Sequence, residues 1–397
     1  MFAEKLLFNA LVEGCPYIHE HRINAVLDVS MALRDSQNLS LTAIGRALTG
    51  PSDIKHKIKK VDRLEGNKNL HEELSDLYRA LSSYVFSYLS QDTALPIVID
   101  VCFMKDDRAI QMLSAEVASK GRTLPIYRKL FNEGELKEQT EDFLKELYHC
   151  IPKGRKVIII MDAGFHCEWF KIIESFEWFW ICRVRQGKSL KLPGSDSWLS
   201  IKDFIPQVKE KTTNYDQILL TKEHEHACRL VTTRRTAKGR SFKDARGNTN
   251  GMGASGRYKS AAKEPWILVT NLPSNDYKST EIVNFYSKRM QIEESFRDVK
   301  SHQFGLCGRY IRTKCIHRWG VKMLLAAIVQ ITYWVIGIIG HSQGMQRVFQ
   351  ANTVKDKKVF SYFTLGKLII EHERLNQITF DESNLAHVIQ QELARKW

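Results

Sequence analysis

Two short apolar runs that each end in an aspartate place the strongest constraint on the fold of this chain. The run LPIVID ends at Asp100, and the run KVIIIMD ends at Asp162. Short apolar runs of this kind are typical of strands that are buried on both faces of a sheet. Because segments with helical periodicity alternate with such runs, the sequence predicts an α/β core with a mixed sheet.

Further strands are expected around these two runs. Residues 109–117 and 122–131 flank the sequence SKGR, which predicts an antiparallel pair joined by a glycine-containing turn. The segments EWFWICRVR and PWILVTNLP are predicted as two later strands. In open α/β sheets the ends of neighbouring strands meet at one crevice, so we expect Asp100 and Asp162 to face the same site.

The stretch EIVNFYSKRMQIEESFRDVKS, residues 281–301, carries the densest pattern of polar chemistry. If it is helical, a turn of about 3.6 residues brings four different polar groups onto one narrow stripe. These groups have the spacing Y-x2-R-x3-E-x6-K and are Tyr286, Arg289, Glu293 and Lys300. A neighbouring apolar stripe would face a core, and it consists of Phe285, Ile292, Phe296 and Val299. On spacing alone, a solvated helix face with ordinary charge pairs is the alternative.

Asp100, Asp162 and Glu293 are candidates for one three-carboxylate site. Clustered carboxylates without basic partners repel one another, and they are tolerated when they hold divalent cations. Mg²⁺ prefers such oxygen ligands, and two ions roughly 3.5–4 Å apart would serve phosphoryl transfer. Taken singly, each acid could instead be a turn cap, a helix N-cap or an ion-pair partner.

The excess of Lys and Arg indicates a polyanionic partner. The formal net charge of +14 favours nucleic acid over an acidic membrane surface, with a merely basic enzyme as the alternative. A basic amphipathic helix near the N-terminus would suit phosphates, a membrane surface or solvent. Its cations are Lys55, Lys57, Lys59, Lys60 and Arg63. Residues 234–263 form a glycine-rich, strongly basic loop that could act as an electrostatic arm.

Cysteine usage and apolar runs bear on the compartment. The eight cysteines are scattered without a C-x-x-C pair, so a zinc ribbon or redox motif is not indicated and a reducing cytoplasm fits. The N-terminus carries acids among its apolar residues, unlike a secretory signal. Residues 323–340 imitate a membrane span, but their marginal length and the polar Gln330 and Thr332 favour a fully buried helix.

Together these motifs resemble the DDE transposases of the insertion-sequence-four family, the cut-and-paste kind found at the ends of bacterial composite transposons. The resemblance rests on IVID with Asp100, IIIMDAGF with Asp162, and FYSKRMQIEESFRDVKS, which matches the family's Y-R-E-K signature in full. It covers nearly the whole chain and is close to the subgroup from a tetracycline-resistance transposon. One departure is Val101-Cys102, where close relatives tend to have Trp and a hydroxyl residue.

The resemblance implies an RNase H-like catalytic core that is interrupted by a mostly β insertion. Residues 1–90 would be a helical region that binds DNA ends, and residues 91–187 and 265–322 would be the two parts of the core. Residues 188–264 would be the insertion with its basic loop, and residues 323–397 would be C-terminal helices that make dimer contacts.

The resemblance also implies the reaction. Asp100, Asp162 and Glu293 would bind two Mg²⁺ or Mn²⁺ ions, and metal-activated water would nick the transposon end. The freed 3′-hydroxyl would attack the opposite strand and form a hairpin. The hairpin would then be reopened, which releases the element for strand transfer into target DNA.

Contacts with DNA and with a second copy follow from the same resemblance. Tyr286, Arg289 and Lys300 would hold phosphates near the cleaved bond, because cations position the backbone. Trp266 matches the family's stacking tryptophan and would stack on a flipped base, with a core aromatic as the alternative. The N-terminal helices would recognise the terminal inverted repeats. A homodimer would hold two ends in a synaptic complex in the bacterial cytoplasm, associated with the nucleoid and not with a membrane.

Three other functions stay open on the sequence. A different metal nuclease on an RNase H-like core would cleave DNA without joining it, and the Y-R-E-K stripe argues against it. An inactive or regulatory relic would only bind DNA, and the presence of all three acids argues against it. A membrane-associated protein would use residues 323–340 as its span, but no second span supports it.

Overall fold

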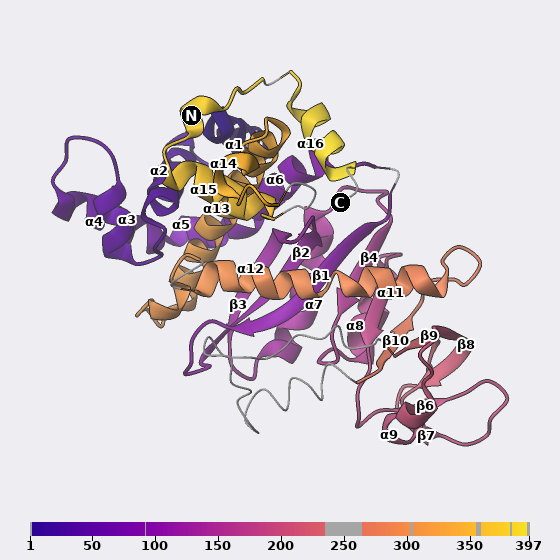
Figure 1. The fold of residues 1–397 in the computed structure, drawn as a ribbon. Coiled ribbons are helices and arrows are strands. Elements are labelled where there is room, and N and C mark those ends of the chain that lie inside the picture. The colour runs from indigo at the N-terminus through magenta and orange to yellow at the C-terminus, as the bar shows by residue number, and fades with distance from the viewer. Residues whose placement is uncertain are drawn as a thin grey trace, which may run out of the picture. The chain divides into compact units, whose positions relative to one another are not determined.

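The chain divides into two compact units in a computed structural model that describes residues 2–91, 93–234, 264–301, 305–354, 359–381 and 383–394. The first unit combines Met1–Val157 with Met290–Trp397, and the second is Ile158–Arg289. Figure 1 traces the elements of both by residue number. The boundary therefore falls inside the segment 281–301, between Arg289 and Met290.

Helices make up the N-terminal part of the first unit, as predicted. They are α1 (Phe2–Gly14), α2 (Glu20–Ser36), α3 (Leu41–Ala47), α4 (Ile54–Glu65), α5 (Lys68–Glu72) and α6 (Leu74–Ser87). Side-chain caps mark several of their starts. For example, Ser40 Oγ accepts the Ala43 N–H at 3.3 Å and Asn67 Oδ1 accepts the Leu70 N–H at 3.2 Å. The helices α5 and α6 follow α4 and meet at Glu73.

Three antiparallel strands follow in the first unit, in the order β3-β2-β1. They are β1 (Leu95–Phe103), β2 (Ile110–Ala118) and β3 (Thr123–Asn132), and α7 (Leu136–Cys150) comes next. The predicted hairpin is confirmed, and Gly121 supplies the positive φ of +87° that its turn requires. One prediction is wrong, since Asp100 does not end its strand. It pairs with Ser114 in mid-strand, and the ladder continues to Phe103 opposite Gln111.

A long apolar helix forms the core of the C-terminal part. The helices here are α12 (Met290–Lys300), α13 (Ile316–Ser342), α14 (Gln346–Phe349), α15 (Tyr362–Glu371) and α16 (Leu385–Ala394), with 3₁₀ turns at Gly308–Tyr310 and Leu375–Gln377. Within the described residues, α13 is the one helix long and apolar enough to cross a membrane, and its most apolar window is entirely buried in the protein. It is therefore a core helix, as the sequence favoured. The helices α13 and α15 meet so closely that a Cβ on Gly337 would lie 1.7 Å from the Tyr362 carbonyl oxygen.

The second unit is a mixed sheet with few helices, in the strand order β4-β5-β10-β9-β8-β6-β7. The elements are β4 (Val157–Met161), α8 (Cys167–Ser175), β5 (Phe179–Arg183), β6 (Ser189–Lys191), β7 (Leu199–Ser200), α9 (Ile201–Phe204), a 3₁₀ turn (Ile205–Gln207), β8 (Thr213–Leu220), β9 (His226–Thr233), β10 (Trp266–Thr270) and α11 (Ser279–Ser287). The β4–β5 pair is parallel and the β5–β10 pair is antiparallel, which confirms the mixed α/β prediction.

The described part of the predicted insertion is mostly strand. Between residues 188 and 234 it holds β6, β7, β8 and β9 with one short helix. The basic loop predicted at residues 234–263 lies outside the described residues, apart from Arg234. The Arg234 side chain donates to the carbonyl oxygens of Val208 and Ile205.

Candidate active site and nucleic-acid interface

Asp162 lies directly after β4, where the sequence placed it, and polar side chains of the second unit surround it. Tyr286 Oη donates to Asp162 Oδ1 at 3.1 Å. Arg289 Nη1 and Arg185 Nη2 lie 3.8 Å and 3.7 Å from Asp162 Oδ2. We call this group the Asp162 cluster, and it consists of Asp162, Arg183, Arg185, Glu264, Tyr286 and Arg289.

Tyr286 and Arg289 reach Asp162 from the end of α11. Two bonds of the 3₁₀ type close this end, from the Lys288 N–H to the Phe285 carbonyl oxygen and from the Arg289 N–H to the Tyr286 carbonyl oxygen, both at 3.0 Å. The Tyr286 ring packs edge-on against Trp266, with 4.9 Å between centroids. Tyr286 and Arg289 are both buried, so packing fixes the two donors that face the acid.

The surroundings keep Asp162 ionised. Burial raises the pKa of this carboxyl, but the Arg289 guanidinium, the Ala163 N–H, Arg185 and the Tyr286 hydroxyl together hold it below its ordinary value. Burial and the Asp162 charge raise the pKa of Tyr286, so the phenol keeps its proton and donates. The cluster thus presents a carboxylate whose side chain is 22% exposed, within reach of a ligand.

The same cluster contains an acid and two arginines that the sequence analysis missed. Arg183 Nη2 pairs with Glu264 Oε2 at 2.8 Å, and Arg185 Nε lies 3.9 Å from the same oxygen. Arg183 ends β5 and Arg185 follows two residues later, on a segment that is otherwise apolar. The arginine at the end of an apolar strand was the available signal for Arg183, because buried arginine is rare unless it is paired.

Asp100 and Glu293, the other two predicted acids, belong to the first unit. Asp100 is half-buried on β1, and its Oδ1 accepts the Val101 N–H at 2.8 Å. Glu293 is exposed on α12, beside a cavity of about 420 Å³. The cavity is lined by Glu293, Phe296, Arg297, Lys300, Ser301, Arg309 and Tyr310. Lys300 Nζ donates to the Phe103 carbonyl oxygen at 3.3 Å, which ties the end of α12 to β1.

Buried polar contacts hold the inner face of α12. Ser295 is fully buried and accepts a hydrogen bond from Gln330 Nε2 of α13 at 3.1 Å. Asp298 Oδ2 accepts from Arg122 Nε at 2.8 Å. As predicted, Ile292, Phe296 and Val299 are buried on the same helix. These contacts fix which way α12 presents Glu293.

The segment 281–301 is not one helix. It forms α11 and α12, with a turn at residues 288 and 289, so the Y-R-E-K residues do not share one continuous helical stripe. The segment contains no Gly or Pro, and periodicity alone gave no sign of this break. Tyr286 and Arg289 belong to the second unit, whereas Glu293 and Lys300 belong to the first. Phe285 is half-buried, unlike the other three residues of its predicted apolar stripe.

The donor chemistry of the three acids fits a divalent cation. Asp100, Asp162 and Glu293 offer carboxylate oxygens, the ligands that Mg²⁺ prefers, and Asp162 is held ionised. Over the described ranges, no group of three or more His, Cys, Asp or Glu side chains is arranged to hold a metal ion. The acids are divided between the two units, so a joint metal site stays a prediction.

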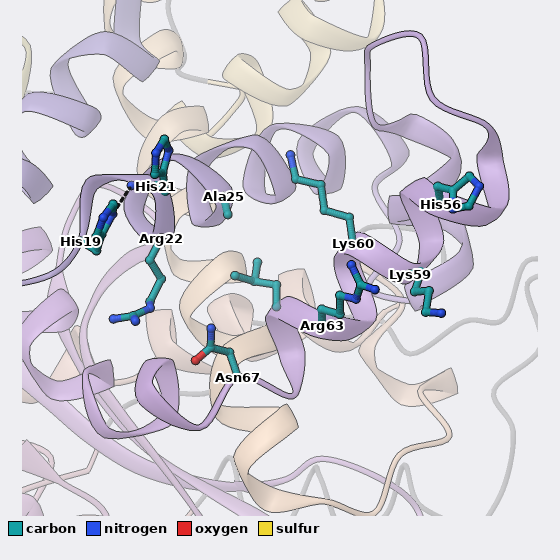
Figure 2. Close-up of a pocket in the computed structure, with 10 residues that line it drawn as sticks. His19, His21, Arg22, Ala25, His56, Lys59, Lys60, Arg63 and Asn67 are labelled. Carbon is teal, nitrogen blue, oxygen red and sulfur yellow. Dashed lines mark hydrogen bonds between the residues drawn. The ribbon is translucent and has the colours of Figure 1, made fainter.

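A second candidate surface is the basic pocket between α2 and α4 (Figure 2). Its volume is about 580 Å³, and its lining is His19, His21, Arg22, Ala25, His56, Lys59, Lys60, Arg63, Leu64 and Asn67. Lys59, Lys60 and Arg63 belong to the helix predicted to contact DNA. The sequence analysis missed the opposite wall, where the rings of His19 and His21 stack with 5.1 Å between centroids. Lys55 and Lys57 lie on the same helix but do not line this pocket.

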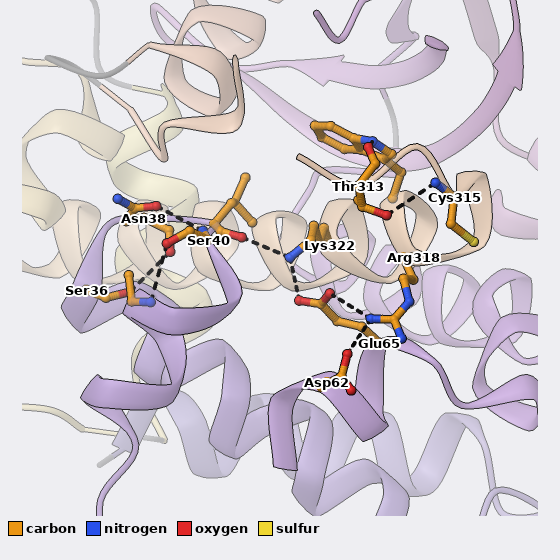
Figure 3. A network of polar contacts seen from close by, with 12 residues as sticks. Ser36, Asn38, Ser40, Asp62, Glu65, Thr313, Cys315, Arg318 and Lys322 are labelled. Atoms are coloured by element: carbon orange, nitrogen blue, oxygen red, sulfur yellow. Dashed lines mark hydrogen bonds and ion pairs between the residues drawn. The ribbon is translucent and has the colours of Figure 1, made fainter. Parts of the chain in front are cut away.

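Polar contacts fasten α4 to the core helix α13 (Figure 3). Lys322 is buried, pairs with Glu65 and donates to the Leu39 carbonyl oxygen at 2.9 Å. Arg318 Nη1 pairs with Asp62 Oδ1 at 2.7 Å. On its other side, α4 packs on α3, where a Cβ on Gly45 would lie 2.7 Å from Ile58 Cα. The exposed basic face of α4 is therefore held rigidly.

Comparison with known proteins identifies the family of the chain. A family model described as a transposase DDE domain matches residues 121–329, more than half of the chain. The matched range contains Asp162, the Y-R-E-K residues and Trp266, and it begins after Asp100. No curated protein matches the chain. The mixed α/β architecture fits the RNase H-like fold expected of such a domain. The chain therefore belongs to the transposase DDE domain family.

Proposed function

We propose that this protein is a cut-and-paste transposase of the insertion-sequence-four kind that cleaves and joins DNA at terminal inverted repeats. The observation that carries the proposal is the Asp162 cluster, in which Tyr286 and Arg289 of the Y-R-E-K signature converge on one ionised carboxylate. In a protein with another function, contacts of two signature residues with Asp162, the candidate acid of the second unit, would be an unusual coincidence.

Asp100, Asp162 and Glu293 would hold two Mg²⁺ or Mn²⁺ ions, which supply Lewis-acid stabilisation of the charge that develops on the phosphate oxygens. The roles of the side chains follow from their contacts. Tyr286 donates to Asp162 and orients its carboxylate, and Arg289 offers a buried guanidinium to a DNA phosphate. Lys300 would contact the phosphate backbone from the end of α12.

Hairpin formation requires sharp bending of the DNA end, so one base is expected to leave the stack. Trp266 is half-buried against Tyr286 and is our candidate for the stacking partner. The ring contact between these two residues would couple the position of a flipped base to the hydroxyl that holds Asp162. The hairpin step and this role of Trp266 belong to the proposal.

The basic pocket between α2 and α4 would bind the terminal repeat. Arginine, lysine and histidine side chains line it, and phosphate contacts of this kind position a duplex before bases are read. The cations proposed for this contact are Lys55, Lys57, Lys59, Lys60 and Arg63, and His19, His21 and Arg22 join them from the opposite wall. Transposition needs two ends, so we propose a homodimer in a synaptic complex, with dimer contacts from the C-terminal helices. We propose that the protein acts on DNA in the bacterial cytoplasm.

The test is cleavage of a labelled duplex that carries the element's own terminal repeat, with Mg²⁺ or with EDTA, on a denaturing gel. A metal-dependent nick that matures into a hairpin is the expected result. Cleavage without a hairpin or joined product would indicate another RNase H-like nuclease. Binding without cleavage in Mg²⁺ and in Mn²⁺ would indicate an inactive or regulatory relic.

A further inference from the structure

Arg185 differs from the other two arginines of the Asp162 cluster in its exposure and in its contacts. Its side chain is 46% exposed, whereas those of Arg183 and Arg289 are 8% and 10% exposed. Arg183 is fixed by a 2.8 Å contact with Glu264. Arg185 stands between two carboxylates, 3.7 Å from Asp162 and 3.9 Å from Glu264.

Both contacts of Arg185 are longer than the 2.7–3.2 Å of a direct hydrogen bond, by roughly half an ångström or more. A guanidinium that is charged, half-exposed and loosely paired can exchange one anion for another at small cost. The two oxygens of a phosphate suit its forked donors at least as well as a carboxylate does.

The charge of the cluster points the same way. Three guanidinium groups face two carboxylates, so the sum, +3 and −2, leaves one positive charge in excess. A divalent cation on Asp162 would raise that excess to +3 and would repel Arg185. A DNA phosphate placed beside Arg185 would reduce the excess and relieve the repulsion.

We infer that Arg185 is a DNA phosphate-binding residue that competes with a divalent cation for Asp162 and thereby makes cation binding and DNA binding mutually favourable. The inference rests on the proposed role of Asp162 as a cation ligand. Without DNA, Arg185 holds the carboxylate and weakens the cation site. With DNA, Arg185 turns to a phosphate and leaves the carboxylate to the cation. Coupling of this kind is reciprocal, so each ligand raises the affinity of the other by the same factor.

The experiment measures Mn²⁺ binding to the full chain by electron paramagnetic resonance, with and without a short DNA duplex of arbitrary sequence. A duplex of arbitrary sequence suffices because phosphate contacts are independent of sequence. For the unchanged protein we expect the duplex to tighten Mn²⁺ binding by about tenfold. We call the factor by which the duplex tightens Mn²⁺ binding the DNA effect. In the absence of DNA, we expect Arg185→Gln to bind Mn²⁺ more tightly than the unchanged protein does. We expect its DNA effect to be below about twofold.

Two further variants separate the charge of Arg185 from its shape and from general electrostatics. Arg185→Lys keeps the charge but loses the forked donors, and we expect a DNA effect between those of the other two proteins. Lys202→Gln removes one charge from α9, which contributes no residue to the Asp162 cluster, and is expected to keep the full DNA effect. A loss in Lys202→Gln equal to that in Arg185→Gln would overturn the inference.

The inference also fails if Arg185→Gln keeps the full DNA effect, or if it weakens Mn²⁺ binding in the absence of DNA. These readouts need no cleavage, so they separate the inference from the proposed function. A chain with normal coupling that never cleaves its terminal repeat would contradict the proposed function alone. A chain that cleaves but shows full coupling in Arg185→Gln would contradict the inference alone.

Discussion

The Asp162 cluster and the buried Glu116–Arg128 pair use the same chemical groups in opposite ways. In the first unit, Arg128 Nη2 lies 2.7 Å from Glu116 Oε1, and neither side chain is exposed. Ser114 Oγ donates to the same carboxylate at 2.8 Å, and Thr123 donates to its other oxygen. Around Asp162, in contrast, the guanidinium contacts are 3.7 and 3.8 Å long and the carboxylate is part-exposed.

The difference indicates which ionic contacts serve the fold and which can serve a ligand. A carboxylate that is enclosed and saturated with short donors has no room for a new ligand, and its pairing fixes one arrangement of the β2–β3 hairpin. A carboxylate that is held ionised by long contacts keeps its charge but can take another partner. Distance and exposure therefore separate the two roles better than residue type does.

Breaking the enclosed pair should have the largest effect on stability. Arg128→Leu leaves the Glu116 charge buried without its cation, and we expect a loss of about 3–5 kcal/mol in the free energy of unfolding. Urea denaturation followed by circular dichroism measures this loss. Arg185→Leu serves as the matched control and should cost less than about 1 kcal/mol, because its ion pairs are half-exposed.

Replacing both partners of the enclosed pair sharpens this prediction. In the double variant Glu116→Gln with Arg128→Met, no uncompensated charge remains, so most of the lost stability should return. If the double variant is no more stable than Arg128→Leu, the stability lost in the single variant does not come from the unpaired charge of Glu116.

Two aspartates with opposite pKa shifts give the next largest effect. Burial raises the pKa of Asp298 from 3.8 to about 7, against the attraction of Arg122. Between these values the folded state holds a proton that the unfolded state has lost, so stability falls as the pH rises toward 7. Between the two pKa values, the free energy of unfolding falls by about 1.4 kcal/mol for each pH unit. Asp298→Asn should remove this fall. Urea denaturation of both proteins at pH 5 and pH 8 measures it.

Asp162 provides the control of opposite sign. Its pKa is lowered, so its contribution to stability is present above the unfolded pKa of 3.8 and is lost as the pH falls through the folded value. Asp162→Asn should therefore leave the stability difference between pH 5 and pH 8 almost unchanged. If it changes as much as Asp298→Asn does, the contrast between the two acids is wrong.

Apart from the controls, Tyr286→Phe should have the smallest effect on stability. It removes the hydroxyl that donates to Asp162 and keeps the ring contact with Trp266, so we expect a loss of about 0.5–1.5 kcal/mol in the free energy of unfolding. Thermal denaturation detects a change of this size. A loss as large as that of Arg128→Leu would place Tyr286 among the structural contacts instead.

Local patterns in the sequence predicted most elements of the fold. Apolar runs identified β1, β2, β3, β4, β5 and β10. The marginal length of residues 323–340 and their polar Gln330 and Thr332 distinguished the buried α13 from a membrane span. The place of Asp100 in its strand could not be read, because β1 continues through Val101 and Cys102, and only pairing with β2 determines where it ends.

The candidate site was predictable only where its residues share a motif. Asp162, Tyr286 and Arg289 were identified from IIIMD and the Y-R-E-K spacing, and the structure brings these three together. The break between α11 and α12 was not predictable, because the segment contains no Gly or Pro and its helical periodicity is continuous. Arg185 follows β5 and Glu264 precedes β10, so these two residues are far apart in sequence and only the pairing of β5 with β10 brings them together.

The most direct test of the account is the single-turnover rate of first-strand cleavage by the unchanged protein and by Asp162→Asn. Both proteins would act in Mg²⁺ on a duplex with the element's terminal repeat, and Asp196→Asn, a change at an exposed loop acid of the same unit, would be the control. We predict that Asp162→Asn lowers the rate by at least about a thousandfold while DNA binding and the control rate are retained. Cleavage by Asp162→Asn at a rate near that of the control would contradict the assignment of Asp162 to the reaction centre.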